Sequence, residues 1–214
     1  MAQDSSDRRT QKRFATRQRI SDVATCLFME RGFDEVTVDQ IAEAAAVSRM
    51  TVFNHFSRKE DMIFDLDDIG RQDVIAALEN RDARVAPVEA LRLFAHQAVA
   101  ERRPYVLFCE AGSDRFVETV QASQVLMARA RAIRDELTDL LAGALAKAAG
   151  RPLPDTGASL AASLIVATWT VAFVEAHRTF HKSHNAAKAY KSFLAIIDQG
   201  SLGVKAAVQG TRYA

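Results

Sequence analysis

The sequence is poor in the residues that shape disulfide-bonded and turn-rich proteins. Its 214 residues include 2 cysteines, 4 prolines and 9 glycines. Two distant cysteines cannot build a disulfide framework, which favours the reducing cytoplasm. The low glycine and proline content disfavours β architectures, which need many turns. The first ten residues contain no apolar run, so we expect no secretory signal.

An excess of charge of one sign is also missing, because 28 Lys and Arg oppose 27 Asp and Glu. Nucleic-acid-binding proteins often have a basic excess, so the total alone argues against that class. The distribution of the charges along the chain, in contrast, favours a nucleic-acid-binding protein. Residues 8–19 contain six basic side chains and no acidic one, whereas residues 60–68 contain five acidic side chains. Because basic groups that neutralise phosphates release counterions, we expect the N-terminal arm to contact DNA.

Apolar residues recur at helical spacing almost throughout the chain. Ile20, Ala24 and Phe28, for example, share one helix face, and Gly32 marks the end of that helix. No alternation of period two bounded by hairpin turns is present. We therefore predict an all-α fold, in which one helix runs without interruption from Ser57 to about residue 78.

One stretch, residues 156–174, has the length of a membrane span and no charged side chain. It contains five serines and threonines, and no belts of aromatic and basic residues flank it. We expect a helix that is buried on most of its faces, and no membrane partner.

Residues 37–56 predict two short helices joined by a tight turn. Thr37 and Gln40 form a capping-box pattern, and Ser48 is the N-cap of the second helix. This is the layout of a helix-turn-helix motif, whose second helix enters the major groove of DNA.

The second helix of this motif has an outward face suited to DNA bases. Val52 and Phe56 turn inward, so Met50 and Asn54 point away from the core, while Arg49 stands at the helix start. Arg and Asn pair bidentately with guanine and adenine, and Met can contact a thymine methyl group. The alternative is an ordinary polar surface helix.

The run from Thr37 to Met62, with Gly32-Phe33 before it, resembles the N-terminal domain of TetR/AcrR-type transcriptional regulators. The resemblance implies a basic disordered arm (1–13), a three-helix helix-turn-helix DNA-binding domain (14–58), a larger helical ligand-binding and dimerisation domain (59–202) and a flexible tail (203–214).

Together with the basic arm, the resemblance gives the residues expected to contact DNA: Arg13, Arg17, Thr37, Arg49, Met50, Thr51, Phe53, Asn54, His55 and Lys59. Two positions depart from the family pattern. Phe53 stands where the family usually has Tyr, so a phosphate-binding hydroxyl is missing. Ala46 stands where Gly is usual, and a left-handed backbone there would cost about 1–2 kcal/mol.

For the C-terminal domain, the resemblance implies an internal cavity for a small, largely apolar effector. The candidate lining residues are Phe94, Tyr105, Phe108, Cys109, Phe116, Met127, Trp169, Phe173 and His177. The alternative is a filled core, which has the same apolar composition. His177, His181 and His184 follow metal-ligand spacing, but a metal site needs three or four converging ligands. We therefore expect a solvated helix end, no metal and no cofactor.

These observations predict a cytoplasmic, ligand-responsive transcriptional repressor. As a homodimer joined by its two C-terminal helices, it would bind a palindromic double-stranded DNA operator, and the effector would release it. A helical enzyme is disfavoured, because nucleotide-binding and hydrolase motifs are missing. A ligand-binding or interaction protein without specific DNA binding is the alternative motivated by Phe53 and Ala46.

Overall fold

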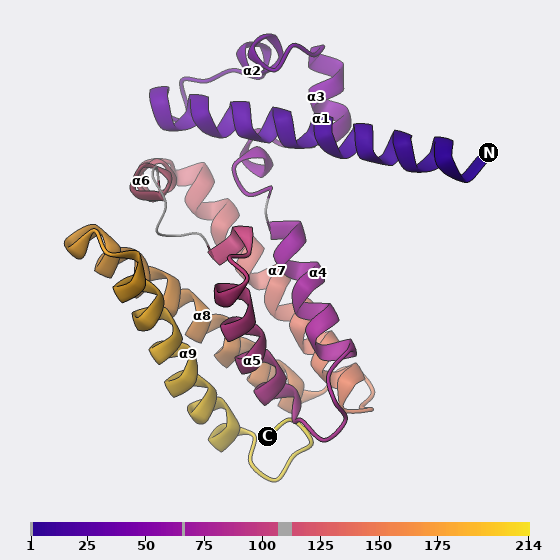
Figure 1. The fold of residues 1–214 in the computed structure, drawn as a ribbon, viewed down its shortest axis with the longest axis vertical. Helices are drawn as coiled ribbons and strands as arrows, with labels where there is room; N and C mark the ends of the chain where they lie inside the picture. The colour runs from indigo at the N-terminus through magenta and orange to yellow at the C-terminus, as the bar shows by residue number, and fades with distance from the viewer. Residues whose placement is uncertain (1, 66, 107–112) are drawn as a thin grey trace. The chain divides into compact units, whose positions relative to one another are not determined.

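The computed structural model describes residues 2–65, 67–106 and 113–214, and within these ranges it contains helices and no strand (Figure 1). The all-α prediction is confirmed. The α-helices are α1 (Ala2–Arg31), α2 (Val38–Ala44), α3 (Arg49–His55), α4 (Asp67–Glu79), α5 (Pro87–Ala100), α6 (Ser113–Ala122), α7 (Gln124–Ala148), α8 (Thr156–Ser183) and α9 (Ala186–Ala207). Two short 3-10 helices are η1 (Lys59–Met62) and η2 (Pro104–Val106).

The chain forms two compact units. The first comprises Met1–Asp65 and Arg115–Ala130, and the second comprises Leu66–Asp114 and Arg131–Ala214. The segment Arg115–Ala130 therefore belongs with the helix-turn-helix residues, although the sequence placed it in the C-terminal domain. We call the two units the N-terminal unit and the C-terminal unit.

The core of the N-terminal unit is built from helix faces that the sequence predicts. Phe28 of α1, Ile41 of α2 and Val52 of α3 have no exposed surface. Helix α1 begins at Ala2, so residues 2–13 are helical where a disordered arm was expected. No proline or glycine interrupts the chain between Ala2 and Gly32, which explains why the helix extends so far toward the N-terminus.

The turn between α2 and α3 has the hydrogen bonds of a Schellman motif. The Val47 N–H donates to the Ala42 carbonyl (2.9 Å), and the Ala46 N–H donates to the Glu43 carbonyl (3.0 Å). Ala46 has a φ of +50°, the left-handed conformation in which glycine is favoured. The departure from the family pattern at Ala46 therefore places a strained alanine in the turn of the helix-turn-helix.

The predicted continuous helix from Ser57 to residue 78 is interrupted. The structure has η1 followed by a turn, and α4 begins only at Asp67. One cause is the hydroxyl of Ser21, which donates to the Met62 carbonyl at 2.9 Å. An uninterrupted helix would use that carbonyl for its own backbone hydrogen bond.

In the C-terminal unit, α8 and α9 lie side by side (Figure 1). A Cβ atom at Gly200 would lie 2.2 Å from Thr168 Cγ2, so this close approach requires glycine. The predicted flexible tail is not separate from this core. Helix α9 continues to Ala207, and Tyr213 is buried, with its hydroxyl donating to Asp155 Oδ1 at 2.8 Å.

Helix α8 is the one described helix long and apolar enough, by length and composition, to cross a membrane. Only 28% of its most apolar segment is buried, so the expectation of burial on most faces is wrong for the single chain. Leu160, Val171 and Val174 are 45–57% exposed. Their spacings of eleven and three residues place them on one face of the helix.

Candidate nucleic-acid interface and effector site

The inner face of α3 anchors this short helix to the N-terminal unit. Val52 is fully buried and Phe56 is 2% exposed, as the sequence predicts. The Ser48 hydroxyl caps the helix by accepting the Thr51 N–H at 3.0 Å. On the outer face Met50 is 69% exposed, the highest exposure among the large apolar residues of the described chain. An exposed methionine with no apolar neighbour to cover it is available to a binding partner.

Other predicted DNA-contacting residues of the motif also lie at the surface. Arg49, Asn54 and Thr37 are exposed, and Phe53 is 44% exposed. The Thr37 side chain completes the predicted capping box, because Thr37 Oγ1 accepts the Gln40 N–H (3.3 Å) while Gln40 Oε1 accepts the Thr37 N–H (2.8 Å). Thr37 therefore stabilises α2 whether or not it also contacts a phosphate.

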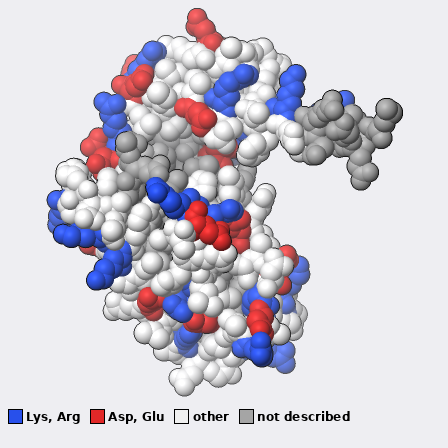
Figure 2. Space-filling model, viewed as in Figure 1, with Lys and Arg blue, Asp and Glu red and all other residues white. Residues whose placement is uncertain are grey.

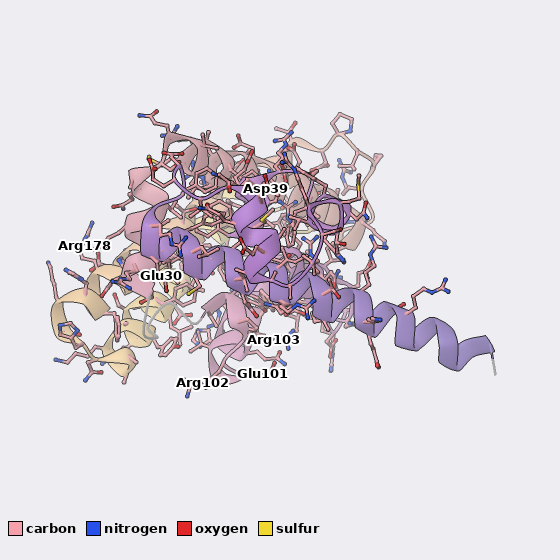
Figure 3. The ribbon with its side chains drawn as sticks, turned by 90° about the horizontal axis from the view of Figure 1, so that it is seen from above. Glu30, Asp39, Glu101, Arg102, Arg103 and Arg178 are labelled. Carbon is pink, nitrogen blue, oxygen red and sulfur yellow. The ribbon has the colours of Figure 1, made fainter. Side chains whose placement is uncertain are left out.

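Arg49 has two neighbours that the sequence did not reveal. Its Nη1 donates to both carboxylate oxygens of Asp39, at 3.1 Å and 2.9 Å, and its Cζ lies 5.6 Å from the centroid of the Phe53 ring. Asp39 belongs to α2 and is labelled in Figure 3. The only signal in the sequence is the opposite charge of two residues on either side of the predicted turn.

Two predicted DNA contacts are instead engaged inside the N-terminal unit. Arg17 Nε donates to Asp65 Oδ1 (2.7 Å), and its guanidinium lies 4.3 Å from the Phe56 ring centroid. Lys59 Nζ donates to the carbonyls of Phe33 and Val36, at 2.7 Å and 2.8 Å. Burial lowers the pKa of Lys59. Both cations therefore join segments of this unit and are less available to phosphates than expected.

His55 is the last residue of α3. The pKa of His55 lies below its usual value of 6.5, first because of partial burial and then because the Arg13 and Arg17 charges repel its cationic form. His55 is therefore neutral near pH 7 unless a phosphate approaches it. Arg13 itself is exposed on α1, as a phosphate contact requires.

The surface charge is mixed. On the face shown in Figure 2, basic and acidic side chains are interspersed and no field of one sign covers it. This arrangement agrees with the near-zero total charge and limits sequence-independent attraction to DNA.

The C-terminal unit brings four of the predicted effector residues into one aromatic row. The ring centroids are 6.3 Å apart for Tyr105 and Phe94, 5.9 Å for Phe94 and Trp169, and 5.9 Å for Trp169 and Phe173. Phe193 of α9 joins the row at 5.5 Å from Trp169. The sequence placed Phe193 only on an amphipathic helix, because an apolar periodicity does not say which cluster a ring joins.

The hydroxyl of Tyr105 already makes a hydrogen bond within the protein. It donates to Asp73 Oδ2 at 2.8 Å, and the pKa of Tyr105 is raised, first by burial and then by this hydrogen bond. Trp169, in contrast, lines a small cleft between α5, α8 and α9. Its free volume is about 10 Å³, which is space for about one water molecule. This cleft is therefore too small to hold an effector in the described state.

The other predicted effector residues do not join this row. Phe116 and Met127 belong to the N-terminal unit, where Phe116 packs edge-on against Phe64 at 6.3 Å. The sequence could not distinguish these two cores, because both attract aromatic side chains. Phe108 and Cys109 lie outside the described residues.

His177 and His181 both lie close to the carboxylate of Asp114. His177 Nε2 is 3.6 Å from Asp114 Oδ1, and His181 Nδ1 is 3.5 Å from the same oxygen. Asp114 Oδ1, His177 Nδ1 and Ser113 Oγ are buried and make no hydrogen bond with any other described residue. Within the described ranges, no group of three or more His, Cys, Asp or Glu could hold a metal ion.

The capped helix pair and the exposed face of α3 define the N-terminal unit as a helix-turn-helix module of the DNA-binding class. Residues 20–66 match the family "Bacterial regulatory proteins, tetR family". The chain is therefore similar to the TetR family over its N-terminal segment.

Relatives with curated names are transcriptional regulators. MftR of Mycobacterium tuberculosis is 36% identical over 81 residues, which is 38% of this chain and 41% of MftR. TcmR of Streptomyces glaucescens is 36% identical over 83 residues (39% and 37%), and the repressor KstR2 of Rhodococcus jostii is 34% identical over 91 residues (39% and 43%). The chain thus spans about two fifths of the length of the curated relatives it matches.

Solved structures extend the likeness in fold to nearly the whole chain. SmeT of Stenotrophomonas maltophilia, solved as a complex with triclosan, has a TM-score of 0.55 at 20% identity and covers 94% of this chain and 95% of its own. NalD of Pseudomonas aeruginosa, described as the secondary repressor of an efflux pump, has a TM-score of 0.55 at 20% identity (87% and 96%). These structures establish the fold of the chain.

Proposed function

We propose that this protein is a cytoplasmic transcriptional repressor, which binds a palindromic DNA operator as a homodimer and leaves it when a small, largely apolar effector binds. The observation that carries the proposal is the outer face of α3. Arg49, Met50 and Asn54 are exposed on a helix whose position is set by buried residues. These side-chain types read guanine, thymine and adenine in the major groove. KstR2 and NalD, which are named repressors, support the direction of regulation.

Dimerisation through the two C-terminal helices is part of the proposal, because one helix-turn-helix reads only half of a palindrome. The exposed apolar face of α8, formed by Leu160, Val171 and Val174, supports it, as does Leu202 of α9, which is 67% exposed. Apolar side chains clustered on one helix face favour a partner that removes them from water.

The effector would bind in the C-terminal unit beside the aromatic row. Phe94, Trp169 and Phe173 supply the apolar surface, and the buried polar atoms of Asp114 and His177 would orient a polar group. The cleft at Trp169 holds only about 10 Å³, so an effector that enters at Trp169 would select a more open state of this unit. Its binding can change DNA affinity only by its preference for that state over the DNA-binding state.

Fluorescence anisotropy with the DNA upstream of the chain's own gene tests the proposal. We expect binding that weakens with salt and prefers this duplex to a scrambled one. Asn54→Ala should lower that preference, whereas Gln97→Ala, an exposed substitution on α5, should not change it. If the wild-type chain binds both duplexes equally, the alternative of a ligand-binding protein without specific DNA binding is favoured.

A further inference from the structure

Arg49 is held on two sides by residues of the helix-turn-helix. Both carboxylate oxygens of Asp39 accept hydrogen bonds from a single guanidinium nitrogen, Nη1, at 3.1 Å and 2.9 Å. The Phe53 ring lies beneath the guanidinium, 5.6 Å from Cζ and so within reach of a cation–π interaction. Both charged side chains are about 60–65% exposed, so the pair lies at the surface.

This arrangement leaves one edge of the guanidinium open. Among the described residues, Nε and Nη2 of Arg49 make no hydrogen bond, and these two nitrogens form one of the forks with which Arg pairs bidentately. Nη1, the third nitrogen, is occupied by Asp39. A fork of two parallel donors matches the O6 and N7 acceptors of guanine in the major groove.

Resting on the proposed function, we infer that Asp39 is a specificity-determining positioning residue, which with Phe53 orients Arg49 so that its Nε–Nη2 edge reads a guanine of the operator. Asp39 acts through Arg49 and does not contact the base. Phe53 stands where the family usually has Tyr, and its ring can form the cation–π contact with the Arg49 guanidinium without a hydroxyl group. Held in place before binding, Arg49 loses less side-chain freedom when it meets the base.

The carboxylate has a second effect that distinguishes this role from a merely structural one. A negative charge on the DNA-facing surface repels phosphates and so weakens binding to every sequence. Removing it should therefore raise non-specific affinity while it lowers selectivity. A variant that only destabilised the fold would lower both.

The experiment selects duplexes from a pool with a randomised central segment, using the full-length wild type and four variants: Asp39→Asn, Asp39→Glu, Arg49→Ala and Glu43→Gln. Glu43 is an exposed acidic residue on the same helix and, among the described residues, makes no hydrogen bond or ion pair with Arg49, so Glu43→Gln makes the same change in charge without removing a partner of Arg49. Dissociation constants for a selected and a scrambled duplex are then measured for each protein.

We expect the wild type to select a site with one guanine column that Arg49→Ala abolishes. Asp39→Asn should weaken the same column, lower the ratio of specific to non-specific affinity about two- to fivefold and raise the affinity for the scrambled duplex. Asp39→Glu should restore the column, and Glu43→Gln should leave it unchanged.

The experiment distinguishes failure of the proposed function from failure of the positioning role of Asp39. If the wild type selects no sequence, the proposed function is wrong. If it selects a site but Asp39→Asn leaves the guanine column intact, the positioning role is refuted and the function stands. Loss of affinity for both duplexes with unchanged selectivity would show that Asp39 only stabilises the fold.

Discussion

Replacing Ala46 by glycine should stabilise the helix-turn-helix. Ala46 has a φ of +50° at the end of α2, and a left-handed backbone costs a non-glycine residue about 1–2 kcal/mol. Glycine would remove this strain, but it adds about 0.4–1 kcal/mol of conformational freedom to the unfolded chain. Because Ala46 is exposed, no packing is lost. The net gain is therefore about 0.5–1 kcal/mol.

Trp169, the single tryptophan of the chain, lies in the C-terminal unit, so its fluorescence does not report on this change directly. Native-state amide hydrogen exchange of α2 and α3 is the suitable assay. Exchange of the Val52 amide, which bonds to the Ser48 carbonyl at 3.1 Å, should slow about two- to fivefold in Ala46→Gly.

The matched control is Ala44→Gly, two residues earlier. Ala44 is also exposed but is the last helical residue of α2, where glycine costs up to about 0.5–1 kcal/mol, so exchange in α2 and α3 should accelerate. Equal acceleration in both variants would refute the reasoning, because it would mean that Ala46 carries no strain.

Three further results are expected. Lys59→Met leaves the carbonyls of Phe33 and Val36 without their donor, so it should lower the free energy of unfolding of the N-terminal unit by about 2 kcal/mol or more. It should not change the salt dependence of DNA binding, and a reduced salt slope at unchanged stability would instead make Lys59 a phosphate contact. The pKa of His55 is lowered in the free protein and a nearby phosphate would raise it, so binding takes up a proton and DNA affinity should increase from pH 7.5 to 6. That gain is at most about tenfold per unit of pKa change, and anisotropy should show no gain in His55→Asn. Val171→Glu places a charge on the exposed face of α8 and should shift sedimentation equilibrium from dimer to monomer, whereas an unaltered dimer would exclude this face.

The parts of the site that could be predicted from sequence are those formed by neighbouring residues. The caps Thr37 and Ser48 and the outward direction of Met50 follow from helix geometry over a few positions. The partners of Arg17 and Arg49 could not be found in this way, because Asp65 and Asp39 reach them only after the helices pack together. Long basic side chains are consistent with a phosphate contact and with an internal ion pair, and only the fold decides between the two.

The same limit applies to the cores. Phe116 and Trp169 both read as buried aromatic residues, yet one packs in the N-terminal unit and the other in the C-terminal unit. Helix α9 continues to Ala207, past the start of the predicted flexible tail at residue 203, and the sequence did not predict this because the last turns of the helix contain small and polar residues that give a weak periodicity.

Helix α3 has seven residues, too few for a helix to be stable in water by itself. The residues that stabilise α3 are not those on its outer face. Val52 and Phe56 are buried, Ser48 caps the first turn, and Arg17 Nη1 donates to the His55 carbonyl at 2.5 Å. The outward positions can therefore be exchanged with little effect on folding. Under the proposed function, substitutions at two or three of these surface positions would change the operator preference without unfolding the domain.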